Sequence, residues 1–148
     1  MKIACQQLSG AGQHRARIVV THHPMDIKLE DRRRLVQRSK AAMKQFVACG
    51  VDLFLSGHLH TGSTVVTSAR YKIKGYSAVV VQAGTAVSTR LRHGEPNAWN
   101  IVRVDGVGPA SGTIEVQPMH WDKTKFKPMR GERYVKRENG WMLETAKR

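Results

Sequence analysis

Four histidines stand directly after two apolar runs, at residues 17–21 and 51–55. They are His22, His23, His58 and His60. Loops at the carboxyl ends of parallel strands form the ligand crevice of an open sheet, so we expect these rings to share one rim. Residues two apart in an extended segment point to one side, so both rings of the second pair can face one site. Imidazole is the commonest side-chain metal ligand, and we predict a metal site formed by His22, His58 and His60.

The other histidines receive different interpretations. His23 has three open roles, since it can sit beside the metal, contact substrate or brace its loop. A single loop histidine is more often solvated or hydrogen-bonded than functional. That is the interpretation for His14, His93 and His120.

A strand–helix–strand unit must position the histidine pairs. Arg17–Thr21 and Val51–Leu55 are short apolar runs, typical of strands buried on both faces. Between them, apolar residues recur at spacings of three and four and predict a helix over about 29–49, with Gly50 as its C-terminal cap. This βαβ unit requires two parallel strands.

The rest of the chain is rich in strand-like segments. They are Thr64–Thr67, Ala78–Gln82, Trp99–Val104 and Thr113–His120. The sequence therefore predicts an α/β fold in a single domain, with the βαβ unit over 1–62, a β-rich segment over 63–121 and a basic tail over 122–148. Within the tail, Tyr134-Val135 is a candidate for a last edge strand.

The charge of the chain makes a polyanion a partner to consider. The 148 residues carry a formal net charge of +14. Aromatic residues are interleaved with the cations of the tail, an arrangement that can form a stacking surface for single-stranded nucleic acid. They are Trp121, Phe126, Tyr134 and Trp141. We favour the simpler interpretation, a solvated face on the predicted helix and a tail whose aromatic rings pack down, because no recognisable nucleic-acid module accompanies the charge.

Two further features bear on location. No stretch approaches the roughly 20 apolar residues that cross a bilayer, so no membrane span is predicted. Cys5 and Cys49 are too few for a disulfide scaffold, and we interpret them as reduced thiols of a cytoplasmic protein.

The two histidine motifs together resemble a known family. Thr21-His-His-Pro24 and Ser56-Gly-His-Leu-His60 resemble the H-[HY]-P and G-H-x-H segments of the calcineurin-like metallophosphoesterases. Residues 83–92 and 95–100 resemble the strand and loop that follow in bacterial members, some of them cyclic-nucleotide phosphodiesterase-like. The resemblance covers about residues 6–121 and corresponds to the C-terminal half of the family's sandwich.

The resemblance implies a metal-dependent phosphoric ester hydrolase of phosphodiesterase or phosphatase type. It implies two divalent ions (manganese, iron or zinc) that clamp the phosphate and bind a bridging hydroxide. It assigns His22 and His58 to the second metal and His60 to the first. His23, Arg90 and Arg92 are candidates for contact with the substrate, since arginine suits phosphate, although an ordinary surface loop is the alternative.

The sequence departs from the family in its acidic ligands. The D-x-H, G-D-x-x-D and G-N-H-[DE] segments, which supply carboxylates and the catalytic histidine, are not in this sequence. We therefore expect no catalytic residue here, and activity that depends on a complementary N-terminal half or on self-association through an exposed sheet edge. The alternative is a non-catalytic basic fragment that binds nucleic acid or pairs with another chain at that edge.

Overall fold

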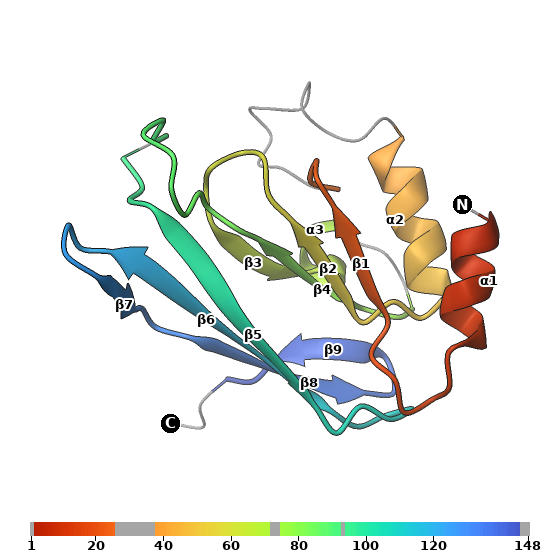
Figure 1. Ribbon diagram of the computed structural model, residues 1–148. Coiled ribbons are helices and arrows are strands. Elements are labelled where there is room, and N and C mark those ends of the chain that lie inside the picture. Colours follow the sequence, from red (N-terminus) through yellow and green to blue (C-terminus); the bar gives the residue numbers. More distant parts are fainter. Residues whose placement is uncertain (1, 26–37, 72–74, 93, 146–148) are drawn as a thin grey trace.

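The protein is a mixed α/β structure with two sheets and few helices (Figure 1). The computed structural model describes residues 2–25, 38–71, 75–92 and 94–145. No helix within these ranges is both long and apolar enough to cross a membrane.

The first sheet contains the predicted βαβ unit. Its strand order is β1-β2-β4-β3, and β1, β2 and β4 are parallel while β3 runs antiparallel to β4. The strands are β1 (Ile18–Thr21), β2 (Leu53–Ser56), β3 (Ser63–Val66) and β4 (Val79–Gln82). Thr21 pairs with Ser56 and Ser56 with Gln82, so three parallel strands end at one level. The prediction that both histidine pairs follow neighbouring parallel strands is confirmed.

Helices cover one face of this sheet. They are α1 (Lys2–Gly10), α2 (Ser39–Ala48) and the short α3 (Thr67–Tyr71). Met43, Phe46 and Val47 of α2 are buried in one cluster with Phe54 of β2, which confirms the predicted apolar stripe. The predicted helical residues 29–37 lie outside the described residues. Gly50 adopts φ +75°, the left-handed conformation expected of a cap.

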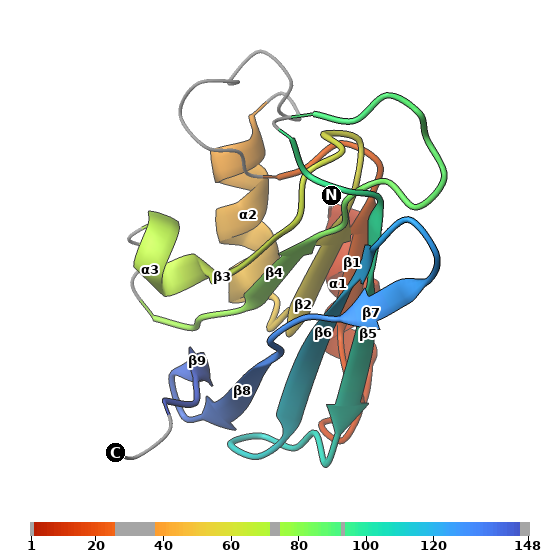
Figure 2. The ribbon, with the colours of Figure 1, turned by 90° about the vertical axis from the view of Figure 1, so that its left-hand side faces the viewer.

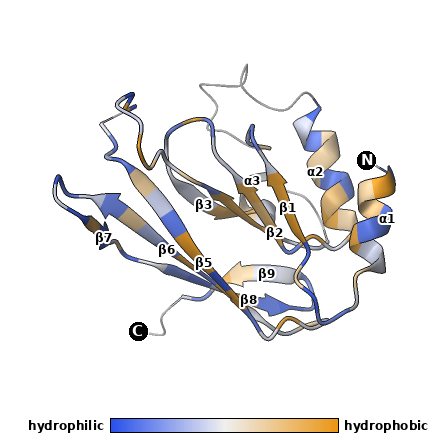
Figure 3. Ribbon diagram, viewed as in Figure 1, coloured by the Kyte–Doolittle hydropathy of each residue, from blue (hydrophilic) through white to orange (hydrophobic). Residues whose placement is uncertain are grey.

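The second sheet covers the opposite face. Its order is β5-β6-β8-β9, with β7 paired to β6, and all its pairs are antiparallel. The strands are β5 (Ala98–Asp105), β6 (Thr113–Trp121), β7 (Phe126–Pro128), β8 (Glu132–Arg137) and β9 (Gly140–Leu143). Leu53, Val79 and Val81 pack against Ile114 and Val116, so the molecule has a helix layer and two sheet layers. Figure 2 shows α2 and β7 on opposite sides of the molecule, and Figure 3 shows apolar residues concentrated on β1, β2 and β4.

The segment predicted as a basic tail folds into the second sheet. Strands β7, β8 and β9 all lie beyond residue 122, and Tyr134 and Trp141 are 2% and 1% exposed. The strand around Tyr134 is internal, between β6 and β9, rather than at an edge. The high density of cations hides the alternation of these short strands in the sequence, and only their pairing within the second sheet makes it visible.

Strand β1 also differs from its prediction. It forms an edge of the first sheet, and Ile18 and Val20 are 41% and 72% exposed, so the strand is not buried on both faces. Val19 packs toward the helices, whereas Ile18 and Val20 belong to neither core cluster. The β-branched composition identified the strand but not its position in the sheet, which depends on how far the second sheet extends.

A buried charge network joins the two sheets. Asp52 Oδ1 accepts hydrogen bonds from Lys136 Nζ at 2.8 Å, Trp141 Nε1 at 2.9 Å and Tyr76 OH at 2.7 Å, and Oδ2 accepts from the Arg17 backbone N–H at 2.9 Å. Burial alone raises the pKa of the Asp52 carboxyl, but Lys136 and the other donors together lower this pKa below its usual range. Burial, followed by the bond to Asp52, raises the pKa of Tyr76 far above its ordinary value. The sequence analysis did not predict this network.

The prediction of two reduced thiols is wrong. Cys5 of α1 and Cys49 at the end of α2 form a disulfide, with their Cα atoms 5.6 Å apart. The two cysteines are 44 residues apart in sequence, and only the packing of α1 beside α2 brings them together. They consequently give no support for a cytoplasmic location.

Reduction of this disulfide is expected to lower the free energy of unfolding by roughly 2–4 kcal/mol, because the bond restricts the unfolded chain. Urea unfolding with and without reductant measures the effect. The double variant Cys5→Ser/Cys49→Ser is the control and should not respond to reductant. Equal midpoints for the oxidised and reduced wild-type protein would contradict the prediction.

Candidate metal centre

Backbone pairing brings the two histidine loops together. The Gly57 N–H donates a hydrogen bond to the His22 carbonyl at 3.4 Å, directly beyond the Thr21–Ser56 pair. The Thr21 hydroxyl donates to the His23 carbonyl at 2.8 Å and fixes the turn that carries both neighbouring rings. Parallel pairing of β1 and β2 therefore places His22, His23 and His58 at one rim.

Three imidazoles converge there. His58 Nδ1 lies 3.0 Å from His22 Nε2, and the ring of His23 lies 4.1 Å from that of His58, centroid to centroid. One nitrogen from each of the three rings lies within 4.8 Å of the others, which identifies His22, His23 and His58 as a group able to hold one ion. His22 and His23 are exposed and His58 is half-buried, so an ion can enter from solvent.

His60 is not part of this group. Its Nδ1 lies 3.0 Å from the Arg90 carbonyl oxygen, in the loop that follows β4. The expected extended segment is absent here, since His58 and His60 adopt φ +71° and +62° around the buried Leu59. Two left-handed residues change the side-chain directions that strand alternation would give. The structure thus unites two of the three predicted ligands and places His23 where His60 was expected.

Left-handed backbone at two histidines is costly, at roughly 1–2 kcal/mol for each residue. Non-glycine residues in such conformations cluster at functional sites, where the surrounding structure holds them. Here Gln82 Nε2 donates to the Thr61 carbonyl at 2.8 Å, and Glu95 Oε2 accepts from the Gly62 N–H at 2.8 Å. These two side chains brace the loop from β4 and from the segment before β5.

Gln82 and Glu95 were not singled out in the sequence. Gln82 is 6% exposed and ends the run Val79–Val81, so a buried amide after three valines is the signal that could have identified it. Glu95 carries no comparable local signal, because its partner Gly62 is 33 residues away in the chain.

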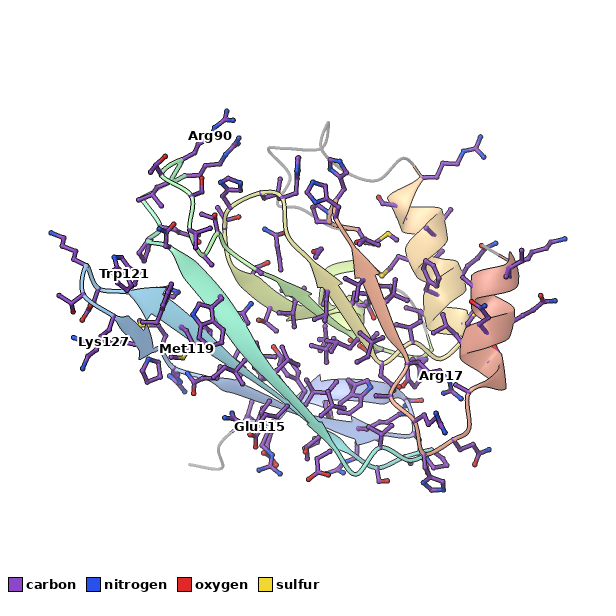
Figure 4. The ribbon with its side chains drawn as sticks, in the orientation of Figure 1. Arg17, Arg90, Glu115, Met119, Trp121 and Lys127 are labelled. Atoms are coloured by element: carbon purple, nitrogen blue, oxygen red, sulfur yellow. A yellow bond between two sulfur atoms is a disulfide. The ribbon has the colours of Figure 1, made fainter. Side chains whose placement is uncertain are left out.

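Arg90 and Arg92 lie in the exposed loop that contacts His60. The Arg90 N–H donates to the Ser88 hydroxyl at 3.0 Å, and Figure 4 shows Arg90 at the outer end of this loop. Arg90 is exposed to solvent and Arg92 is half-buried.

A cavity of about 350 Å³ opens between the two sheets and is lined in part by the braced loop. Its polar lining includes Gly62, Glu95, Asn100, His120 and Arg130. Because Gly62 and Glu95 belong both to the brace and to the cavity wall, a ligand in the cavity would contact the loop that carries His60.

The donor set fits one transition-metal ion. Tetrahedral ligation at about 2.0–2.1 Å requires ligand nitrogens roughly 3.3 Å apart, close to the 3.0 Å between His22 and His58. The nitrogen that His23 offers lies within 4.8 Å of the other two. Among the described residues this group contains imidazoles only, and the carboxylate nearest in sequence, Asp26, lies outside those residues. The described residues therefore fit one ion better than the two expected from the resemblance.

No family model, no curated protein and no solved structure matches this chain.

Proposed function

We propose that the chain forms the histidine-bearing part of a metal-dependent phosphoric ester hydrolase. One observation carries the proposal: three imidazoles converge at the carboxyl ends of two neighbouring parallel strands, with His22 Nε2 only 3.0 Å from His58 Nδ1. We further infer that the two sheets correspond to the C-terminal half of a metallophosphoesterase sandwich. The support is the placement of the H-H-P and G-H-L-H segments at adjacent strand ends.

His22, His23 and His58 would hold a zinc, manganese or iron ion. When bound, such an ion polarises a phosphoryl oxygen and lowers the pKa of coordinated water. Imidazole ligands are neutral and would leave the charge of the ion available to an anionic substrate. In this proposal His60 has a different task, since its bond to the Arg90 carbonyl holds the arginine loop beside the site.

Arginine side chains would bind the substrate phosphate. In the loop that His60 contacts, Arg90 is exposed and Arg92 is half-buried, and arginine binds phosphate oxygens in a bidentate manner. The net charge of +14 would raise the local concentration of anionic esters around the protein. In this proposal the cavity beyond Gly62 takes the alcohol portion of the ester.

The proposal also includes a partner that supplies carboxylates. A second ion and a catalytic acid or base need acidic groups, which the three-imidazole group does not provide. Edge strand β1, with Val20 72% exposed, offers a place where a complementary N-terminal half or a second copy could add a strand.

Hydrolysis of bis(p-nitrophenyl) phosphate and p-nitrophenyl phosphate tests the proposal. With manganese, zinc or iron, and with a complementary N-terminal half that supplies the acidic ligands, we expect turnover that EDTA abolishes and added metal restores. His58→Asn should reduce the rate about 100-fold or more, and Arg90→Ala should mainly raise KM. Stoichiometric metal binding without any turnover by the protein reassembled with that half would overturn the hydrolase assignment while leaving the metal site intact. Turnover unaffected by His58→Asn would overturn the site.

A further inference from the structure

Aromatic and apolar side chains gather on the outer face of the second sheet. Trp99 pairs with Met119 across β5 and β6, and Trp121 pairs with Phe126 across β6 and β7. Directly opposed residues of an antiparallel pair point to the same face. Ala98 and Val116, at alternate positions, are buried on the inner side, so the two tryptophans and Phe126 face outward.

Phe126 holds the two indole rings in a fixed arrangement. Its ring centroid lies 6.0 Å from that of Trp99 and 5.2 Å from that of Trp121. The tryptophans are 37% and 38% exposed, and Met129 nearby is 48% exposed. Tyr134 and Trp141 of the same chain segment are buried. The interpretation that the aromatic rings pack down is therefore correct for one pair of rings and wrong for Trp121.

Basic residues are frequent in the chain segment that carries Trp121 and Phe126. From Trp121 through Arg133 the chain carries five Lys or Arg residues, Arg133 included, and two carboxylates. The β6–β7 turn is held by Asp122, whose Oδ1 accepts from the Thr124 N–H at 2.9 Å and the Lys125 N–H at 2.9 Å. Lys127 beside it, with these bonds, lowers the pKa of the Asp122 carboxyl well below its usual range, so the turn keeps its charged cap at neutral pH. Lys123 and Lys125 are exposed and lie in this turn, which the Trp121–Phe126 pair closes.

We propose that this face of β5, β6 and β7 binds single-stranded nucleic acid, with unpaired bases stacked on Trp99 and Trp121 and phosphates held by Lys123 and Lys125. Exposed flat rings among cations suit a strand whose bases are unstacked and whose backbone is anionic. A purely apolar protein partner would leave the lysines unpaired, and a purely electrostatic partner would leave the rings unused. Figure 4 shows Trp121, Met119 and Lys127 together at this end of the second sheet, and α2 lies on the opposite side in Figure 2. The proposal goes beyond hydrolysis and does not depend on it.

Fluorescence anisotropy with labelled 12-mers of oligo(U) and oligo(dT) tests the proposal, in EDTA so that metal coordination and hydrolysis do not contribute. We expect the two strands to bind within about threefold of each other, because stacking and phosphate contacts do not read the 2′-hydroxyl. A duplex of the same length should bind more weakly, since its bases are already stacked. Binding should weaken as salt rises, with a slope of about −0.7 for each phosphate contact.

Two pairs of variants locate the surface. Trp121→Ala should weaken binding at least about fivefold, whereas Trp121→Phe keeps a ring and should restore most of the affinity. Lys123→Glu should weaken binding and reduce the salt slope by about 0.7, whereas Lys44→Glu makes the same charge change on α2 and should have much less effect. Unfolding midpoints of all four variants show whether each is folded.

Three results would overturn the proposal. Equal affinity of wild type and folded Trp121→Ala would show that the rings do not take part. Equal losses in Lys123→Glu and Lys44→Glu would show that the net charge binds without a defined site. A dimer that Trp121→Ala dissociates in the absence of oligonucleotide would show that a second copy of the chain covers this face.

Discussion

Asp52→Asn is expected to destabilise the protein by about 3–5 kcal/mol, because the change leaves the Lys136 ammonium buried without its carboxylate. Asp52 and Lys136 are 0% and 3% exposed, so water cannot replace the lost partner. Asparagine has nearly the shape of aspartate, and the loss therefore measures charge rather than packing. Native proteins have free energies of unfolding of only about 5–15 kcal/mol, so this loss would be a large fraction of the total stability. Urea unfolding followed by circular dichroism measures the change.

Companion variants separate the pair from its surroundings. Lys136→Met should cost less than Asp52→Asn, because Tyr76, Trp141 and the Arg17 N–H still donate to the carboxylate. The double variant should be less destabilised than the sum of the two single variants, since neither buried charge then remains. Glu115→Gln, in an exposed pair with Arg133, is the control and should leave the midpoint almost unchanged. If the Asp52→Asn variant were as stable as the wild-type protein, the network would contribute little to stability.

The same network gives a pH dependence with a defined sign. The pKa of Asp52 is lower in the folded protein than its ordinary value of 3.8. The folded state therefore binds its proton less readily than the unfolded state, and stability rises with pH in this range. The contribution of Asp52 should be complete above about pH 5 and should be lost as pH falls below 4 toward the folded pKa. Wild type should consequently lose stability more steeply than Asp52→Asn between pH 5 and pH 3, and parallel profiles would contradict this prediction.

The second large effect is expected in metal affinity. His22→Ala, His23→Ala and His58→Asn should each weaken Zn²⁺ or Co²⁺ binding about 100-fold or more, because each removes one of three ligands. His60→Asn should change the affinity by no more than about threefold, because its ring lies against the Arg90 carbonyl instead. Asparagine is chosen at both left-handed positions, since it tolerates positive φ and leaves the backbone undisturbed.

Isothermal titration with Zn²⁺ and the visible absorbance of Co²⁺ measure these affinities. Binding should weaken at acidic pH in wild type, because imidazole must be unprotonated to bind a metal ion. The comparison of His23→Ala with His60→Asn decides between two ligand sets. A large loss in His60→Asn with no loss in His23→Ala would restore the set expected from the sequence resemblance and reject the one that the geometry favours.

The sequence by itself determined the elements whose signals are local. Runs of mostly apolar residues at 17–21, 51–55 and 78–82 identify strands, and the spacing of Met43, Phe46 and Val47 identifies a helix stripe. Gly50 marks the end of that helix because few other residues accept its conformation. From these elements the parallel pairing of β1 and β2 follows, and with it the meeting of His22 and His58 at one rim.

The features that depend on contacts between residues far apart in the chain were decided only by the tertiary structure. His23 replaces His60 in the imidazole group because left-handed backbone at residues 58 and 60 changes the direction of both rings. Asp52 meets Lys136, and Cys5 meets Cys49, across 84 and 44 positions of sequence. Neither pairing leaves a periodic trace, because periodicity records which face of an element is buried and not which element buries it. For the same reason the sequence predicted strand β1 but not the exposure of Val20 at the edge of the sheet.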